Sequence, residues 1–368
     1  MNLRVTFLSP AVLAALGAAL LFGASTPLAK QFVGEMSAFM LAGLLYLGSG
    51  MGLLLVRLWR DRGWRASGVS PGQWPWLMGA IAFGGVAGPA LLMLGLAHAT
   101  AAAASLLLNL EGVLTALLAW LIFKENADRR IVIGMLLIVA GGVLLAWPGA
   151  GPQAAGSVMG PLYIAAACFC WAVDNNLTRK VSNADAFFIA GLKGWAAAAV
   201  NIGLALTLGS ALPDWPVMAP ILLIGFSGYG LSLVLFVIAL RGLGAARTGA
   251  YFGAAPFIGS ALAIAVFGEP TSAMFWSAAL LMALGIALHL SERHEHLHTH
   301  RPLRHGHPHV HDEHHQHLHQ NAAPVGTAQP HDHVHDHEAL VHRHAHFPDI
   351  HHRHDHATRA QVRDGSGR

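Results

Sequence analysis

Charged side chains are scarce in this sequence. Lys, Arg, Asp and Glu make up 11% of the 368 residues, while hydrophobic residues make up 54%; a soluble globular protein has about 25% charged residues. The shortage is confined to the first 290 residues, which hold 14 basic and 9 acidic side chains. Residues 291–368 hold 8 and 10, together with 23 of the 25 histidines. The chain therefore divides into a long apolar body and a short polar tail.

Cysteine is almost absent as well. Cys168 and Cys170 lie in one apolar segment, and residues two apart on a helix face different sides. We therefore expect no disulfide between them, and they imply no redox framework. The sequence also shows no pair of nucleophile and base and no nucleotide-binding motif. We therefore expect neither an enzyme nor a nucleic-acid-binding protein, and no required cofactor.

Long apolar stretches are what the body has in abundance. A helix needs about 20 apolar residues to cross a bilayer. We therefore expect an all-α membrane protein with ten transmembrane helices. The ten spans lie at residues 10–29, 34–57, 73–97, 100–122, 130–147, 158–178, 184–208, 217–240, 245–267 and 273–290.

Basic residues are unevenly distributed between the loops that join these spans. With the N-terminus in the cytoplasm, the inner segments carry twelve Lys or Arg residues and the outer loops carry only Lys30. Lys and Arg stay on the cytoplasmic side during membrane insertion. The pattern predicts a multi-pass protein of the inner membrane with both termini in the cytoplasm.

One segment of the body occurs twice. Residues 94–125 and 238–269 align without a gap at an offset of 144, and both end in Phe-x-Glu, at Glu125 and Glu269. Five spans per repeat is an odd number, so the second repeat must enter the membrane from the opposite side. The sequence thus predicts two inverted five-helix repeats. They lie at residues 10–147 and 158–290, with a linker at 148–157 and the tail at 291–368.

These features together resemble a known family. Ten spans, two five-helix halves and the endings at Glu125 and Glu269 are similar to the drug/metabolite transporter superfamily, specifically its EamA-type exporters. The resemblance covers residues 10–290. It implies a carrier in the cytoplasmic membrane that moves small metabolites, often outward and driven by the proton gradient. Two features depart from the pattern: Glu111 has Ala255 as its repeat partner, and the histidine tail is not part of the family core.

Ionisable residues are rare within the spans, and an acidic one at mid-helix costs about 3 kcal/mol. Glu111 is nearly central in the fourth span. It could be a proton-coupling carboxylate or a ligand for a cationic substrate; the alternative is a neutral glutamic acid bonded to a neighbouring helix. Thr115, four residues further on, shares its face of the helix.

Asp174 and Lys193 lie in consecutive, antiparallel spans, within roughly one helical turn of each other in depth. We expect them to pair. Lys193 could bind an anionic substrate group while Asp174 balances its charge, or the pair could be a structural link between two helices. Asn175, next to Asp174, is a further candidate for the substrate or proton pathway.

Histidine recurs at every second position in three blocks of the tail. Pro, Gly and Ala separate the blocks, and this composition predicts disorder. Neutral imidazole is a good ligand for Zn, Ni, Co and Cu, so we expect the tail to bind divalent metal ions. The adjacent acidic residues able to add oxygen ligands are Asp312, Glu313, Asp332 and Asp336. A low-complexity extension with incidental metal affinity is the alternative. The candidate ligands are His294, His296, His298, His300, His305, His307, His309, His311, His331, His333, His335 and His337.

Three functions remain open at this point. The leading hypothesis is a secondary active transporter of small metabolites, acting as a proton-coupled exporter. The second is a divalent-metal carrier whose cytoplasmic tail captures or senses the ion. The third is a non-transporting membrane protein whose tail stores metal. The expected partners are the lipid bilayer, a small-molecule substrate and divalent metal ions; whether two copies form a homodimer stays open.

Overall fold

The computed structural model describes residues 9–63, 67–123, 129–147, 158–181, 184–290, 295–300, 303–309, 331–337 and 340–345. These residues belong to two units, Met1–Glu292 and Arg293–Arg368. The first half of the helical unit contains α1 (Pro10–Lys30), α2 (Ala38–Asp61), the 3-10 turn η1 (Pro71–Gln73), α3 (Trp74–Ala80), the π-helix η2 (Ile81–Ala87), α4 (Gly88–His98), α5 (Ala101–Leu107), α6 (Asn109–Phe123) and α7 (Arg129–Ala146). The second half contains α8 (Met159–Thr178), the 3-10 turn η3 (Arg179–Val181), α9 (Ala186–Thr207), α10 (Trp215–Gly225), the π-helix η4 (Phe226–Leu231), α11 (Ser232–Phe252), α12 (Ala255–Phe267) and α13 (Ala273–Leu290).

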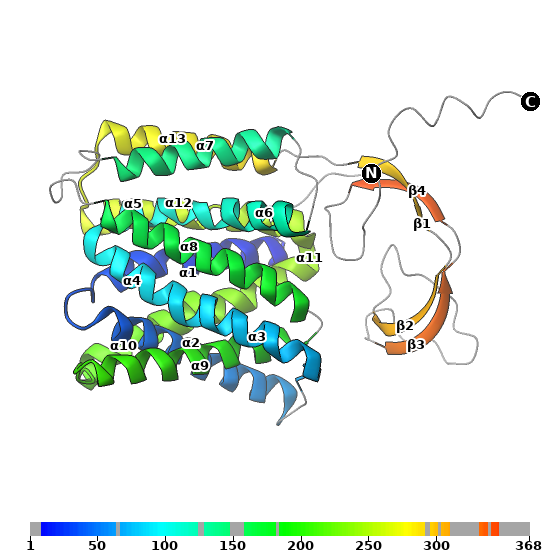
Figure 1. Ribbon diagram of the computed structural model, residues 1–368, viewed down its shortest axis with the longest axis horizontal. Coiled ribbons are helices and arrows are strands. Elements are labelled where there is room, and N and C mark those ends of the chain that lie inside the picture. Colours follow the sequence, from blue (N-terminus) through cyan, green and yellow to red (C-terminus); the bar gives the residue numbers. More distant parts are fainter. Residues whose placement is uncertain are drawn as a thin grey trace, which may run out of the picture. The chain divides into compact units, whose positions relative to one another are not determined.

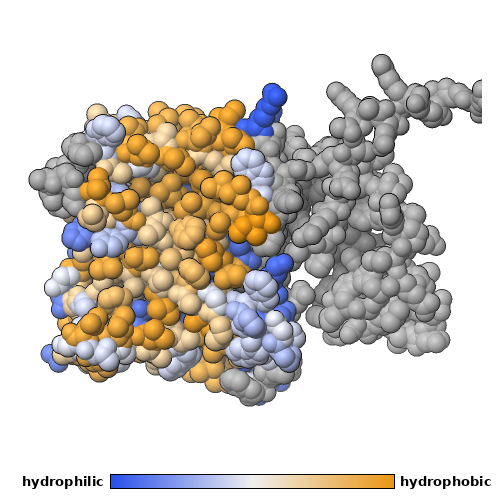
Figure 2. Space-filling model, viewed as in Figure 1, coloured by the Kyte–Doolittle hydropathy of each residue, from blue (hydrophilic) through white to orange (hydrophobic). Residues whose placement is uncertain are grey.

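Seven stretches of the described helices are long and apolar enough to cross a membrane, and two further apolar helices, Ala255–Phe267 and Ala273–Leu288, are shorter. These seven stretches, the two shorter helices and α8 correspond to the ten predicted spans. Figure 2 shows apolar side chains over the visible face of the helical unit, with hydrophilic residues gathered mainly toward its edges. The prediction of an all-α membrane protein is therefore confirmed for the body.

One predicted boundary is wrong. We expect a loop between residues 240 and 245, but α11 runs on from Ser232 to Phe252. In the first half the chain breaks before Thr100, whose side chain accepts a hydrogen bond from the Ala103 amide and starts α5. The aligned position in the second half is Gly244, which has no side chain to cap a new helix.

Equivalent elements of the two halves pack against each other. Figure 1 shows α7 beside α13 in one layer, with α2, α9 and α10 in the layers farthest from it. The pair α7 and α13 and the pair α2 and α9 make some of the most extensive helix contacts, and α1 packs on α12 as α8 packs on α6. This reciprocal packing is what a fold of two related halves requires.

Contacts at one end of the unit show that the halves run in opposite senses. Helix α1 ends at Lys30, whose Nζ donates to the carbonyl of Leu96 near the end of α4. Helix α8 begins at that same end, because Gly160 lies directly against the His98 carbonyl. The first helix of one half therefore ends where the first helix of the other half begins, which confirms the predicted inversion.

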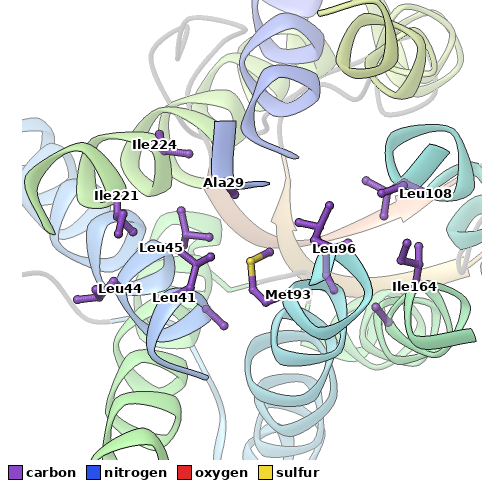
Figure 3. Close-up of a cluster of buried hydrophobic side chains, with 14 of the residues drawn as sticks. Ala29, Leu41, Leu44, Leu45, Met93, Leu96, Leu108, Ile164, Ile221 and Ile224 are labelled. Atoms are coloured by element: carbon purple, nitrogen blue, oxygen red, sulfur yellow. The ribbon is translucent and has the colours of Figure 1, made fainter. Parts of the chain in front are cut away.

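A cluster of buried apolar side chains fills the interior near this end. Figure 3 shows Met93 between the leucines of α2 and Leu96 of α4. Leu41, Leu45 and Met93 are each 1% exposed and Leu96 is fully buried. Burial of such side chains contributes about 1.5–3 kcal/mol each in water, and in lipid their close packing takes over this role.

The described residues of the second unit form the strands β1 (Glu295–His300), β2 (Leu303–His309), β3 (His331–His337) and β4 (Leu340–Ala345). They form two antiparallel pairs, β1 with β4 and β2 with β3. The sequence predicts disorder for the tail as a whole, and the residues described within it are these short extended segments. Of the predicted metal ligands, His294 and His311 lie outside the described residues.

Candidate functional site

The expected ion pair between the sixth and seventh spans is present. Lys193 Nζ of α9 donates to Asp174 Oδ1 at 2.6 Å and to Asp174 Oδ2 at 2.5 Å. The side chains of Lys193 and Asp174 are only 17% and 8% exposed. Thr178 Oγ1 donates to Asp174 Oδ1 at 2.8 Å from the next turn of α8. Three hydrogen bonds from two donor groups thus fix this carboxylate between the two helices.

The π-helix η2 lies directly against Asp174. A Cβ atom at Gly84 would be 1.9 Å from Asp174 Oδ2, so only glycine fits here. The wide turn of a π-helix leaves backbone carbonyls available, and Gly84 O accepts from Tyr46 Oη at 3.1 Å and from Trp171 Nε1 at 3.0 Å. Side chains of α2 and α8 therefore hold this irregular turn next to the ion pair.

A second polar cluster joins α6 to α8. Asn175 Nδ2 donates to Glu111 Oε1 at 2.9 Å and to Thr115 Oγ1 at 3.3 Å. Asn176 Nδ2 donates to the backbone carbonyl of Thr115 at 3.3 Å. The structure thus brings Glu111, Thr115 and Asn175 together, as three of the five residues that the sequence selects for the pathway.

The two clusters differ in charge. Asp174 and Lys193 neutralise each other. Glu111 is half-buried and forms no ion pair among the residues that the structure describes. By formal charge, this region of α6, α8 and α9 therefore carries one carboxylate in excess, and it can accept a proton or a cationic group.

Aromatic rings lie beside these clusters. Tyr46 and Tyr229 are 5.5 Å apart between ring centroids, and Phe22 meets Tyr229 edge-on at 6.0 Å. They come from α2, η4 and α1, so rings of both halves meet here. Sequence reasoning missed Tyr46. In an apolar span, the sequence pattern does not distinguish an aromatic residue that packs from one that lines a site.

The second π-helix occupies the position equivalent to the first. Gly228 in η4 follows Gly84 in η2 by the same offset of 144, and a Cβ at Gly228 would be 2.5 Å from Cβ of Ser25. Each irregular turn therefore packs on the first helix of the other half, through Asp174 in one case and Ser25 in the other. A search for glycines that recur at the repeat offset would have found both positions.

At the end opposite Lys30, one carboxylate joins the halves. Asp185 Oδ2 accepts from Arg60 Nη2 at 2.5 Å, and Asp185 Oδ1 accepts from the Phe187 and Phe188 amides at the start of α9. Burial alone would raise the pKa of Asp185. The hydrogen bonds from Arg60 and the Phe188 amide, with the charges of Arg60 and Arg57, outweigh burial and hold this pKa below its usual range.

At the Lys30 end, Glu269 has the corresponding role. Its Oε1 accepts from the Ala101 amide at 2.8 Å and its Oε2 from the Ala102 amide at 2.7 Å. The glutamate that ends the second Phe-x-Glu sequence therefore caps α5 of the first half. This contact gives a structural reason for a glutamate at that position of the repeat.

Apolar spans, antiparallel halves and a polar site between their helices define a membrane transporter. A comparison with known protein families identifies the family: the EamA-like transporter family matches residues 9–147 and again residues 158–291. The chain belongs to this family. The two matches fall on the two halves of the helical unit.

Individual relatives agree with this assignment. An uncharacterized transporter of Methanothermobacter thermautotrophicus is 28% identical over 283 residues, which cover 73% of this chain and 82% of the relative. A probable 4-amino-4-deoxy-L-arabinose-phosphoundecaprenol flippase subunit ArnE of Pseudomonas paraeruginosa is 41% identical over 114 residues, which cover 30% of this chain and 95% of the relative. One solved crystal structure is 25% identical, with a TM-score of 0.54, over 76% of this chain and 96% of the other.

Proposed function

We propose that the chain is a secondary active transporter that exports small metabolites in exchange for protons, with Glu111 as the coupling carboxylate. The observation that carries this proposal is the contact between Glu111 and Asn175. It places within the spans a carboxyl group that has no cationic partner among the described residues. A charge in the membrane costs free energy that a bound proton or cation removes. Binding and release of a proton or a cation at Glu111 can therefore be linked to movement of the two halves.

The exposure of Asn175 supports a pathway at this position. Asn175 is exposed although it lies within a predicted span. Polar side chains of membrane helices face the interior of the bundle or a water-filled path rather than lipid. We infer that water and substrate reach Glu111 alongside Asn175 and Thr115.

We further propose that the substrate carries an amino group. An ammonium group can take the place of the proton on Glu111, and the nearby Tyr46 and Tyr229 rings provide the faces that favour cations. The ArnE relatives, whose name includes an amino sugar, are consistent with this chemistry. The ion pair of Asp174 and Lys193 then shapes the site without adding net charge.

The proposed location is the inner membrane with both termini in the cytoplasm. The end of the unit that holds Arg57, Arg60 and Asp185 also holds Lys180, whose carbonyl accepts from Gln73 of η1. Lys30 lies at the opposite end, beside Leu96. The distribution supports placing the arginine-rich end in the cytoplasm.

The experiment uses proteoliposomes with an imposed pH gradient and a panel of amino acids and amines. We expect substrate movement to follow the gradient in the wild type. Glu111→Gln should abolish this dependence and keep downhill exchange, whereas the matched exchange of the exposed loop residue, Glu35→Gln, should change nothing. Full coupling in the Glu111→Gln variant would remove this residue from the mechanism.

Transport of metal ions stays a separate hypothesis. Among the described side chains of the helical unit, no group of three or more His, Cys, Asp or Glu is placed to hold an ion. Measurement of zinc and nickel flux in the same proteoliposomes tests this hypothesis independently of metabolite transport.

A further inference from the structure

The fourth span is interrupted one turn before Glu111. Helix α5 ends at Leu107 and α6 begins at Asn109. The Glu111 amide donates to the carbonyl of Leu108, three residues back, at 3.1 Å. In a regular α-helix this amide would donate to the residue four back, which is Leu107. The span therefore makes one tight turn of the 3-10 type immediately before the carboxylate that we assign to coupling.

A thiol from α8 donates to the carbonyl that this tight turn releases. Cys168 Sγ donates to the carbonyl of Leu107 at 3.7 Å. Cys168 is fully buried, in the same apolar cluster as Leu107 and Leu108. A thiol is a weak donor, but a buried carbonyl that loses its partner costs free energy. The thiol therefore stabilises the tight turn relative to an uninterrupted helix.

Helix α8 contacts the same span at a second level. Asn175 donates to Glu111 Oε1 and to Thr115 Oγ1. Cys168 and Asn175 are seven residues apart, which is close to two turns of a helix, so they share one face of α8. One contact fixes the backbone before Glu111, and the other holds its carboxylate. The direction of this side chain thus depends on both.

The internal repeat also connects the thiol with the carboxylate. Asp174 and Ser25 occupy equivalent positions, because each packs on the glycine of the matching π-helix. Six residues before Asp174 is Cys168, and six residues before Ser25 is Ala19. The repeat partner of Glu111 is an alanine as well. The half-sites therefore differ at both positions together: one has a thiol and a carboxylate, and the other has two alanines.

We propose that Cys168 is a positioning residue for Glu111, because its thiol maintains the tight turn before α6 and so directs the carboxylate toward Asn175. The consequence for transport rests on the proposed coupling role of Glu111. The contact itself does not.

Loss of the thiol should turn Glu111 about the helix axis. Without this donor, the Glu111 amide can return to the Leu107 carbonyl and make the helix regular. Successive residues are rotated by about 120° in a 3-10 turn and by about 100° in an α-helix. Each residue of the turn that changes then rotates the Glu111 side chain by about 20°. Its carboxylate leaves the position at which Asn175 donates to it.

The test measures the accessibility of the carboxyl group and needs no substrate. The probe is dicyclohexylcarbodiimide, an apolar reagent that modifies protonated carboxyl groups within membranes. It is applied to the full-length chain in detergent, and mass spectrometry follows labelling of the peptides that carry Glu111 and Asp174. Cys168→Ala should raise the labelling rate of Glu111 at least threefold and leave that of Asp174 unchanged. Cys168→Ser keeps a donor and should label more slowly than Cys168→Ala.

The matched control is Cys170→Ala, because a residue two positions further along α8 faces another side of the helix. It should label as the wild type does. Equal labelling of Glu111 in the wild type and Cys168→Ala would overturn the proposal. An equal rise at Asp174 would overturn it too, because this result indicates general loosening of the bundle. If Cys168→Ala does not fold, wild-type labelling and the Cys168→Ser variant decide: a serine variant with a labelling rate above that of Cys170→Ala supports the contact, and equal rates contradict it.

This experiment separates the inference from the proposed function. Altered labelling in Cys168→Ala together with full coupling in Glu111→Gln would remove the coupling role and leave the positioning contact. Unchanged labelling together with lost coupling in Glu111→Gln would refute the positioning contact alone.

Discussion

Lys193 donates to both carboxylate oxygens of Asp174, at 2.6 and 2.5 Å, and so ties α9 to α8. Removal of one member of a buried ion pair leaves a charge without compensation. We expect Asp174→Asn to destabilise the protein by about 3–5 kcal/mol, and the double variant Asp174→Asn with Lys193→Met to recover most of this loss. Thermal unfolding in detergent measures both. A double variant as unstable as the single one would show that the two side chains are not coupled.

Gly84 leaves space for the same carboxylate. Gly84→Ala places a Cβ 1.9 Å from Asp174 Oδ2, so the ion pair must shift and transport should fall at least tenfold. Gly112→Ala is the control, since nothing lies within 4 Å of a Cβ added there, and it should be neutral or stabilising by up to about 1 kcal/mol. Initial rates in proteoliposomes compare the two. The prediction fails if both variants transport as the wild type does.

Glu269 caps α5 through two amide hydrogen bonds. Glu269→Ala removes both acceptors from the start of that helix and should lower the free energy of unfolding by about 1–2 kcal/mol. The control is Glu35→Ala, which removes an exposed glutamate from the α1–α2 connection. Melting temperatures in detergent that fall equally for both variants would argue against a special contribution from Glu269.

Stability should depend on pH through Asp185. Its pKa is lower in the folded chain than the ordinary value of 3.8, so the folded state favours the charged form. This contribution is complete above pH 3.8 and is lost as the pH falls through the lower folded-state pKa. Asp185→Asn should reduce the melting temperature at neutral pH and flatten its fall in acid. If the melting temperature of the variant falls in acid as steeply as that of the wild type, groups other than Asp185 cause the acid sensitivity.

Much of the body follows from hydropathy. Runs of about 20 apolar residues are needed to cross a bilayer, so the ten spans could be located from the sequence. Asp174 and Lys193 could also be paired, because consecutive antiparallel helices place residues near their connection at similar depth. A second match between the halves, Ser37-Ala38-Phe39 against Asp185-Ala186-Phe187, has an offset of 148, so it does not align with the Phe-x-Glu repeat at 144.

Only the tertiary structure decided which polar groups meet. Glu111 and Asn175 are 64 residues apart, and their contact depends on α6 packing against α8. The position of Gly84 against Asp174 depends on a π-helix, and the hydrophobic periodicity of the sequence does not predict one. Hydropathy fixes which segments enter the membrane, because every apolar residue contributes to it independently; contacts between distant segments depend on how all the helices and strands pack together.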